Sequence, residues 1–282
     1  MPHTSIFCRN AGEGVGVGLS FIATVSGQPS LAGATIDYRA PSITDLVSPK
    51  VFITPGGETI YINGYNFGPA TLRDDYDVPL VGALFPTSRY GKTKTSTGVA
   101  ISPSALSFSG VNCFVLVKHT MIQCTTNEGT GKDLAWSVTI GAQTSEASKQ
   151  LTAYAPPIVA IYGGKGNDYF APGAHLADTT GGEPVYITGS NFGPIGSPIN
   201  SVTYGVDGND FIAANCGFSI AHTQLLCNTT VGAGSGLKWL VTIDGQISTV
   251  PSTDYAPPVI TSVSGPGSMD ASTDGGDIVI LT

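Results

Sequence analysis

Charged side chains are scarce in this chain. They make up 11% of its 282 residues, against about 25% in an ordinary soluble domain. Lysine and arginine number only 12, against 20 aspartates and glutamates, so the formal net charge is −8. Because a phosphate-binding surface needs clustered basic side chains, the composition argues against nucleic acid and against an acidic membrane face as partners.

Long apolar runs are missing as well. No stretch approaches the roughly 18 residues of a membrane span, so we expect no membrane insertion within this segment. The first residues lack the apolar core of a signal peptide, and none is expected there. No window shows convincing helical periodicity. Hydrophobic residues nevertheless reach 41%, which is enough to bury a core.

An internal repeat organises the sequence. Its first landmark is a His-Thr pair followed shortly by a cysteine, at residues 3–8, 119–124 and 222–227. Each copy continues with a Gly-rich stretch, an apolar stretch, a glutamine and a Tyr-x-x-Pro, whose tyrosines are Tyr38, Tyr154 and Tyr255. A Gly-Gly-acid triplet recurs at 56–58, 181–183 and 275–277, and Asn-Phe-Gly-Pro at 66–69 and 191–194. The period of about 100 to 116 residues matches an immunoglobulin-like sandwich.

Local patterns predict an all-β fold. Residues 59–63 and 185–188 are β-branched or aromatic and are bounded by glycine and proline, as in short strands. Trp136, Val138 and Ile140 alternate with smaller polar residues, so one face of that strand should be buried.

The landmarks of the second repeat resemble an IPT/TIG domain. They are Ala-Pro-Pro at 155–157, the run from Gly-Gly-Glu to Asn-Phe-Gly-Pro at 181–194, and Thr-Gln-Leu-Leu-Cys-Asn-Thr-Thr at 223–230. Domains of this family are Ig-like sandwiches of plexin-type ectodomains, fibrocystin-like proteins, bacterial surface proteins and some transcription factors. This chain lacks the basic loops of the transcription-factor branch. The resemblance therefore implies tandem immunoglobulin-like sandwiches in a linear extracellular array.

The repeat also predicts the domain boundaries. Residues 38–153 and 154–254 form complete domains, 1–37 match only a C-terminal half, and 255–282 match only an N-terminal half. Such halves should expose open strand edges and apolar faces. Few residues separate the domains at the Tyr-x-x-Pro junctions, so we expect a fairly stiff rod.

Two explanations of the halves stay open. The chain is either a window from a longer tandem array or a subunit that polymerises head to tail by strand complementation, on an interface that does not close. Joined halves would still lack what residues 189–221 supply in the second repeat. In both cases residues 3–25 and 259–282 are the assembly or continuation surfaces.

The cysteines predict two disulfides. Cys113 and Cys124 are eleven positions apart, as are Cys216 and Cys227, which would place each pair across adjacent antiparallel strands. Zinc sites need CxxC-type pairs, which the sequence lacks. Disulfides indicate an oxidising, extracellular or cell-surface setting. Cys8 has no partner within this chain, because the same spacing would place its partner before Met1.

The residues that suggest catalysis are explained better as copies of a scaffold. One repeat position is occupied by the histidines His3, His119 and His222, and His175 stands alone in a loop. The Gly-rich residues 12–18 lack the Lys-Ser/Thr of a phosphate loop and should form a turn. The acids after Gly-Gly should belong to turns: Glu58, Glu183 and Asp277. No nucleophile elbow or HExxH motif occurs, so we expect no enzyme and no catalytic or cofactor-binding residue.

One acidic cluster is a weak calcium candidate. Asp74, Asp75 and Asp77 supply alternating carboxylates, and Ca²⁺ takes oxygen ligands. A solvated loop explains the same residues. No other metal or cofactor is expected.

Glycans are the expected modification. Asn228 begins an Asn-Thr-Thr sequon beside a predicted disulfide cysteine. Residues 86–97 and 102–104 are rich in serine, threonine and proline, which suits O-glycosylation.

Together these features predict a structural subunit or segment of an extracellular filament. Its partners would be further copies of itself or continuing repeats, head to tail. Two alternatives remain, a spacer of a cell-surface receptor or adhesin ectodomain and an accessory module of a carbohydrate-active enzyme.

Overall fold

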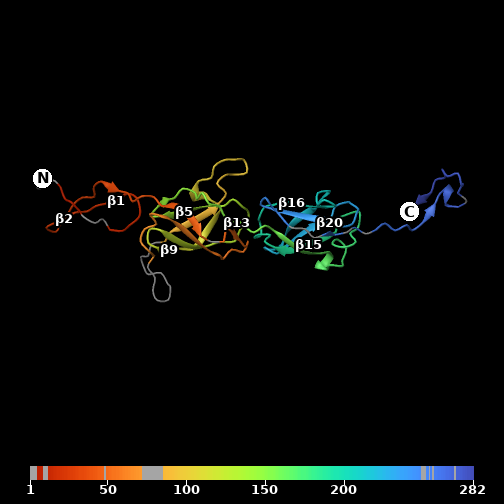
Figure 1. The fold of residues 1–282 in the computed structure, drawn as a ribbon, viewed down its shortest axis with the longest axis horizontal. Helices are drawn as coiled ribbons and strands as arrows, with labels where there is room; N and C mark the ends of the chain where they lie inside the picture. The colour runs from red at the N-terminus through yellow and green to blue at the C-terminus, as the bar shows by residue number, and fades with distance from the viewer. Residues whose placement is uncertain are drawn as a thin grey trace.

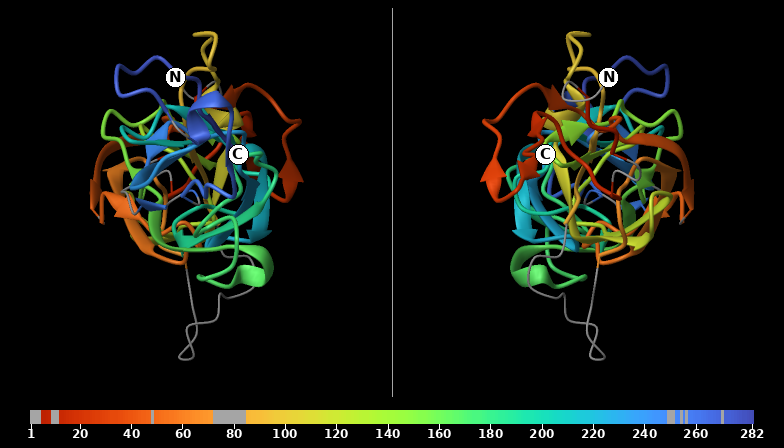
Figure 2. Two further views of the ribbon diagram at one scale, coloured as in Figure 1. Left: turned by 90° about the vertical axis from the view of Figure 1, so that its right-hand side faces the viewer. Right: turned by 90° about the vertical axis from the view of Figure 1, so that its left-hand side faces the viewer.

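The computed structural model describes residues 5–8, 12–47, 49–71, 85–248, 252–253, 255, 257–269 and 271–282. Two β-sandwiches lie in a row, with a short strand-containing segment beyond each of them (Figure 1). Figure 2 looks along this row from both ends and shows the sandwiches one behind the other. No helix within these ranges is long and apolar enough to cross a membrane.

The first sandwich is built around the long strand β9 (Phe108–Val117), which pairs with β8 near its start and with β10 along the rest of its length. It therefore joins the two sheets, and the ladder runs β12-β11-β8-β9-β10-β7-β5. The short strand β6 pairs in parallel with β13. The other elements are β5 (Ser42–Val47), β6 (Val51–Phe52), β7 (Thr59–Tyr65), β8 (Thr87–Gly91), η1 (Pro103–Ala105), β10 (Met121–Thr125), β11 (Ala135–Ile140), β12 (Gln143–Thr144) and β13 (Ala153–Tyr154).

The second sandwich repeats this plan with separate sheets. One has the order β14-β15-β19-β18 and the other β17-β16-β20-β21, with β22 also paired to β20. The elements are β14 (Ile158–Gly163), η2 (Lys165–Asn167), β15 (Pro184–Ser190), β16 (Ile199–Gly205), β17 (Phe211–Ile212), β18 (Ala214–Ile220), β19 (Gln224–Asn228), β20 (Leu237–Ile243), β21 (Gln246–Ile247) and β22 (Ser252–Thr253).

Each core is centred on a stacked tyrosine and tryptophan from paired strands. In the first sandwich Trp136 lies parallel to Tyr90 with ring centroids 4.1 Å apart. In the second, Trp239 and Tyr204 are 4.3 Å apart. All four side chains are buried. Because such rings bury large apolar areas, the alternation seen in the sequence places the heaviest side chains between the sheets.

A second tyrosine closes each core. Tyr154 packs in the first sandwich and Tyr255 in the second, although both were expected to open the following domain. The hydroxyl of Tyr154 lies 2.6 Å from that of Tyr90, and the hydroxyl of Tyr255 lies 2.6 Å from that of Tyr204. Burial is the main reason that the pKa values of Tyr154 and Tyr255 lie well above the usual 10.0. Each of these rings therefore packs backward, into the core of the sandwich that precedes it in the chain.

The N-terminal segment has the pairing of the last strands of a sandwich. It contains β1 (Leu19–Ser20), β2 (Thr24–Val25), β3 (Gln28–Pro29) and β4 (Thr35–Ile36). Strand β1 pairs with β4, as β20 pairs with β22, and β2 pairs with β3, as β20 pairs with β21. Tyr38 donates its hydroxyl to the carbonyl of Gly12 at 2.6 Å, as Tyr154 does to that of Asn127. These contacts form although much of the apolar surface is exposed.

The C-terminal segment has the pairing of the first strands. Strand β23 (Val263–Ser264) pairs with β24 (Ile280–Leu281), with η3 (Pro266–Ser268) between them. The equivalent pair in the second sandwich is β14 and β15. Both terminal segments expose large apolar side chains: Leu19, Phe21, Ile22, Val25, Leu31, Ile36, Val259, Ile260, Val263, Ile278, Val279, Ile280 and Leu281.

Candidate functional site: the junctions between sandwiches

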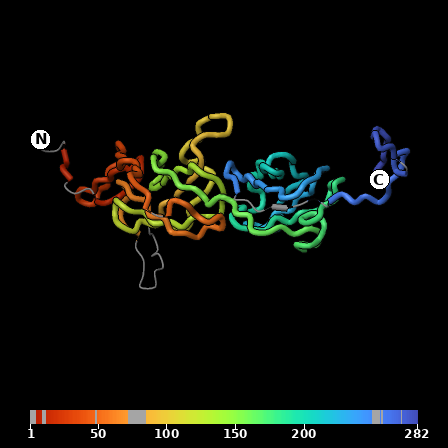
Figure 3. Tube along the Cα trace, turned by 45° about the vertical axis from the view of Figure 1, so that its right-hand side comes forward, coloured from red at the N-terminus to blue at the C-terminus, as the bar shows by residue number. Residues whose placement is uncertain are grey.

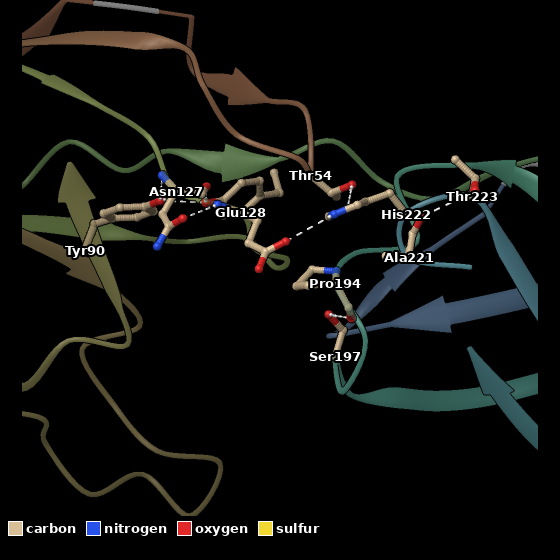
Figure 4. Close-up of polar contacts among 10 residues, drawn as sticks. Thr54, Tyr90, Asn127, Glu128, Pro194, Ser197, Ala221, His222 and Thr223 are labelled. Atoms are coloured by element: carbon tan, nitrogen blue, oxygen red, sulfur yellow. Dashed lines mark hydrogen bonds and ion pairs between the residues drawn. The ribbon is translucent and has the colours of Figure 1, made fainter. Parts of the chain in front are cut away.

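A histidine of the second sandwich lies between two groups of the first (Figure 4). The Nε2 atom of His222 is 3.3 Å from a carboxylate oxygen of Glu128, and its Nδ1 atom is 3.0 Å from the hydroxyl of Thr54. His222 lies in the left-handed turn between β18 and β19, with φ of 63°. Thr54 is completely buried there. The histidine thus bridges two loops at the end of the first sandwich.

Asp244, in the turn between β20 and β21, makes the second contact. Its carboxylate accepts hydrogen bonds from the ammonium of Lys92 at 2.6 Å and from the hydroxyl of Thr130 at 3.4 Å. The backbone at Gly131 must approach this carboxylate closely, because a Cβ there would collide with it. Charged and polar groups therefore meet where the two sandwiches touch.

A side-chain-to-backbone hydrogen bond makes the third contact. Gln246, at the end of the same turn, donates its amide to the carbonyl of Tyr154 at 2.8 Å. Tyr154 is the last residue of the first core, so the bond holds the turn against the point where the chain passes between sandwiches.

The N-terminal segment meets the first sandwich through equivalent groups. Gln143 donates its amide to the carbonyl of Tyr38 at 2.7 Å. Glu13 accepts from Lys118 at 2.9 Å and lies 3.7 Å from Nε2 of His119. The hydrogen bond and charge of Lys118, aided by the charge of His119, lower the pKa of Glu13 below 4.5. Two successive junctions thus use a glutamine, a histidine and a glutamate in the same places.

Sequence reasoning identified the repeated histidines as scaffold features but missed their partners. His119 and His222 both lie at junctions, while His3 lies outside the described residues. The partners Glu13 and Glu128 belong to the Gly-rich stretches, where the available signal was an acid repeated before the same glycine. His175 is elsewhere, stacked 6.3 Å from Tyr169 in the loop after β14.

The acids after Gly-Gly are confirmed as turn residues. Each carboxylate accepts a hydrogen bond from the backbone N–H five positions earlier: Glu58 from Ile53 at 2.6 Å, Glu183 from Asp178 at 2.7 Å, and Asp277 from Ser272 at 2.6 Å. Since these groups are occupied in equivalent turns, they are not a pair of acid and base groups converging on one site.

Both expected disulfides are present. Cys113 on β9 is bonded to Cys124 on β10, and Cys216 on β18 is bonded to Cys227 on β19. In each sandwich the bond therefore joins neighbouring strands of one sheet. Cys8 is exposed and carries a free thiol.

The positions expected to carry glycans are half-buried at Asn228 and exposed at residues 93–97. Asn228 is half-buried at the end of β19 and donates its side-chain amide to the carbonyl of Gly182 at 2.8 Å. Residues 93–100 form an exposed loop that projects from the first sandwich (Figure 1). Glycosylation at these positions stays a prediction.

The three aspartates of the calcium candidate, Asp74, Asp75 and Asp77, lie outside the described residues. Within the described ranges, no three histidine, cysteine, aspartate or glutamate side chains are grouped so that they could hold a metal ion.

Comparison with known proteins gives the family. A family model described as "IPT/TIG domain" matches residues 41–153 and 177–256, which is more than half of the chain. The chain belongs to the IPT/TIG domain family. One matched segment lies in each sandwich, so the resemblance expected from the Gly-Gly-Glu and Asn-Phe-Gly-Pro landmarks is confirmed.

Solved structures with partial similarity include an extracellular region and two adhesins. The Plexin A4 extracellular region is 20% identical over 76% of this chain, with a TM-score of 0.28. The Yersinia pseudotuberculosis adhesin InvE is 15% identical over 83% and 63% of the two chains, with a TM-score of 0.37. The Escherichia coli adhesin FdeC is 15% identical over 86% and 74%, with a TM-score of 0.29. This IPT/TIG chain spans 18% of the plexin chain. No curated protein sequence matches it.

Proposed function

We propose that this IPT/TIG chain is a structural segment of an extracellular filament. Its work is mechanical rather than catalytic: it holds sandwiches at fixed spacing and orientation. The observation that carries the proposal is the repeated junction, where Gln143 and Gln246 donate to equivalent tyrosine carbonyls. A contact repeated between successive units generates a linear assembly.

The setting follows from the cysteines. Two disulfides persist only under oxidising conditions, which supports an extracellular or cell-surface location. Glycans on Asn228 and on the serines and threonines of residues 86–97 and 102–104 would keep a rod with few charges soluble.

The terminal segments are the surfaces through which the filament continues. The N-terminal segment has the last strands of a sandwich and the C-terminal segment the first, and both expose apolar side chains such as Leu31 and Val259. Covering such surface is favourable by about 25 cal/mol per Å². The partners are further copies of the chain or further repeats, joined head to tail.

Electron microscopy of native material tests this function. We expect fibres whose axial repeat equals a small whole number of sandwiches. Separate short rods, or rods that end in a binding head, would overturn the filament and favour the spacer of a receptor or adhesin ectodomain. An intact mass equal to that of the bare sequence would overturn the glycans alone.

A further inference from the structure

The end face of the second sandwich corresponds to the surface of the first sandwich that is buried where the two sandwiches meet. Backbone hydrogen bonds establish the equivalence: the N–H of Gly129 donates to the carbonyl of Thr54 as that of Gly232 does to Thr179. We define the end face by Thr179, Val231, Ala233, Gly234 and Tyr255. The residues in the same places at the end of the first sandwich are Thr54, Glu128, Thr130, Gly131 and Tyr154.

The two surfaces differ in what covers them. Thr54 and Thr130 are 0% and 5% exposed beneath the second sandwich, whereas Thr179 and Ala233 are exposed. A groove of about 910 Å³ lies on the end face, bounded by Thr179, Ala233 and Tyr255 among others. Residues 257–262 leave this face as an extended segment toward β23 (Figure 3).

The chain carries a hairpin turn of the kind that covers this surface at the other two junctions. Residues 26 and 27 connect β2 to β3, which begins at Gln28, and Val25 is paired to Gln28 as Ile140 is to Gln143 and Ile243 is to Gln246. Gln28 is exposed, whereas Gln143 and Gln246 are half-buried at their junctions.

The charges match as well. At the junction between the two sandwiches, the residues Glu128, Lys92 and Asp244 are charged. On the end face Val231 stands in the place of Glu128, and Val206 in that of Lys92. In the free turn Ser26 stands in the place of Asp244. An uncharged turn therefore faces the neutral positions 206 and 231, and the nearest charges lining the groove are the acids Asp178 and Glu183. A turn with Asp244 would add a carboxylate beside them without its Lys92 partner, which is costly.

We propose that the 26–28 turn of a second copy docks on the end face, with the amide of Gln28 donating to the carbonyl of Tyr255. This inference rests on the proposed filament and names its copy-to-copy contact. The docked N-terminal segment would lie beside the β23–β24 segment of the first copy. The contact uses none of the strands that residues 199–220 supply in the second sandwich, so it does not require a complete composite domain.

Disulfide trapping tests the contact. One full-length chain carries Ser26→Cys, another carries Ala233→Cys, and both carry Cys8→Ser to remove the exposed thiol. On mild oxidation after mixing we expect a mixed dimer, and Gln28→Ala in the first chain should reduce its yield severalfold. The internal standard is one chain with Thr130→Cys and Asp244→Cys, the equivalent pair, which should crosslink within itself.

The outcomes separate this inference from the filament. No mixed dimer beyond that given by Ser104→Cys in place of Ser26→Cys, with the internal standard crosslinked, overturns the contact. If fibres are still seen, the proposed function stands without it. A mixed dimer without fibres supports the contact and overturns the filament.

Discussion

Single tyrosine hydroxyls tie the ends of these domains together. Tyr38, Tyr154 and Tyr255 each donate to a backbone carbonyl in the Gly-rich stretch. Two of them also meet the hydroxyl of a core tyrosine, Tyr90 or Tyr204. A buried hydroxyl network is stabilising only while every member has a partner. Each tyrosine therefore stabilises the end of a domain through its hydroxyl and is more than a linker residue.

Removal of one hydroxyl should measurably weaken a domain. We expect Tyr154→Phe to lower the free energy of unfolding of the first sandwich by about 1–3 kcal/mol, because Tyr90 and the Asn127 carbonyl lose a buried partner. The chain has two tryptophans, one in each core. A Trp239→Phe background therefore lets Trp136 fluorescence report urea unfolding of the first sandwich alone. The matched control is Tyr65→Phe, at an exposed position, and an equal loss there would contradict this role of the hydroxyl.

One disulfide bond joins two adjacent strands in each sandwich. The disulfide between Cys113 and Cys124 joins β9 to β10, where register shifts interrupt the ladder. The same holds for β18 and β19. A covalent bond beside irregular pairing limits how far the two strands can separate.

Loss of this disulfide should destabilise one sandwich without unfolding its neighbour. For Cys113→Ala with Cys124→Ala we expect the unfolding free energy of the first sandwich to fall by about 3 kcal/mol, the loop-closure value for a short loop. Denaturation followed by Trp136 and Trp239 in turn measures both domains. Cys8→Ser serves as the control and should change neither transition. A similar loss in the second sandwich would show that the domains unfold together.

The row of sandwiches depends on small polar junctions. His222 and Gln246 link the second sandwich to the first, and both contact residues remote in sequence. Neither lies in a hydrophobic core. These hydrogen bonds therefore help to fix the orientation of the domains, and we expect their loss to leave both folds intact.

Cutting these contacts should make the rod flexible. In the full chain, His222→Ala with Gln246→Ala is expected to broaden the distribution of distances between spin labels placed on the two sandwiches. The melting temperature of each sandwich should change little. His175→Ala removes a histidine of the second sandwich away from the junction and should leave the distribution unchanged. An unaltered distribution in the double variant would contradict the role of the junction.

Much of this architecture could be predicted from the amino-acid sequence. The repeated landmarks, the alternation around Trp136 and the eleven-residue cysteine spacing predicted β-sandwiches, the IPT/TIG family and the paired cysteines. These features are local, because strand pattern and turn chemistry depend on neighbours within one hairpin.

The rest required the assembled molecule. The repeat places Tyr154 at a domain boundary, and only the structure shows that its ring packs backward against Tyr90. Glu128 and His222 are 94 positions apart, and His222 is 168 positions from Thr54. The repeat marks equivalent residues in different domains but does not say which of them meet, since their meeting depends on how two finished surfaces fit. The repeat in the sequence therefore established the units, and only the tertiary structure decided how one unit holds the next.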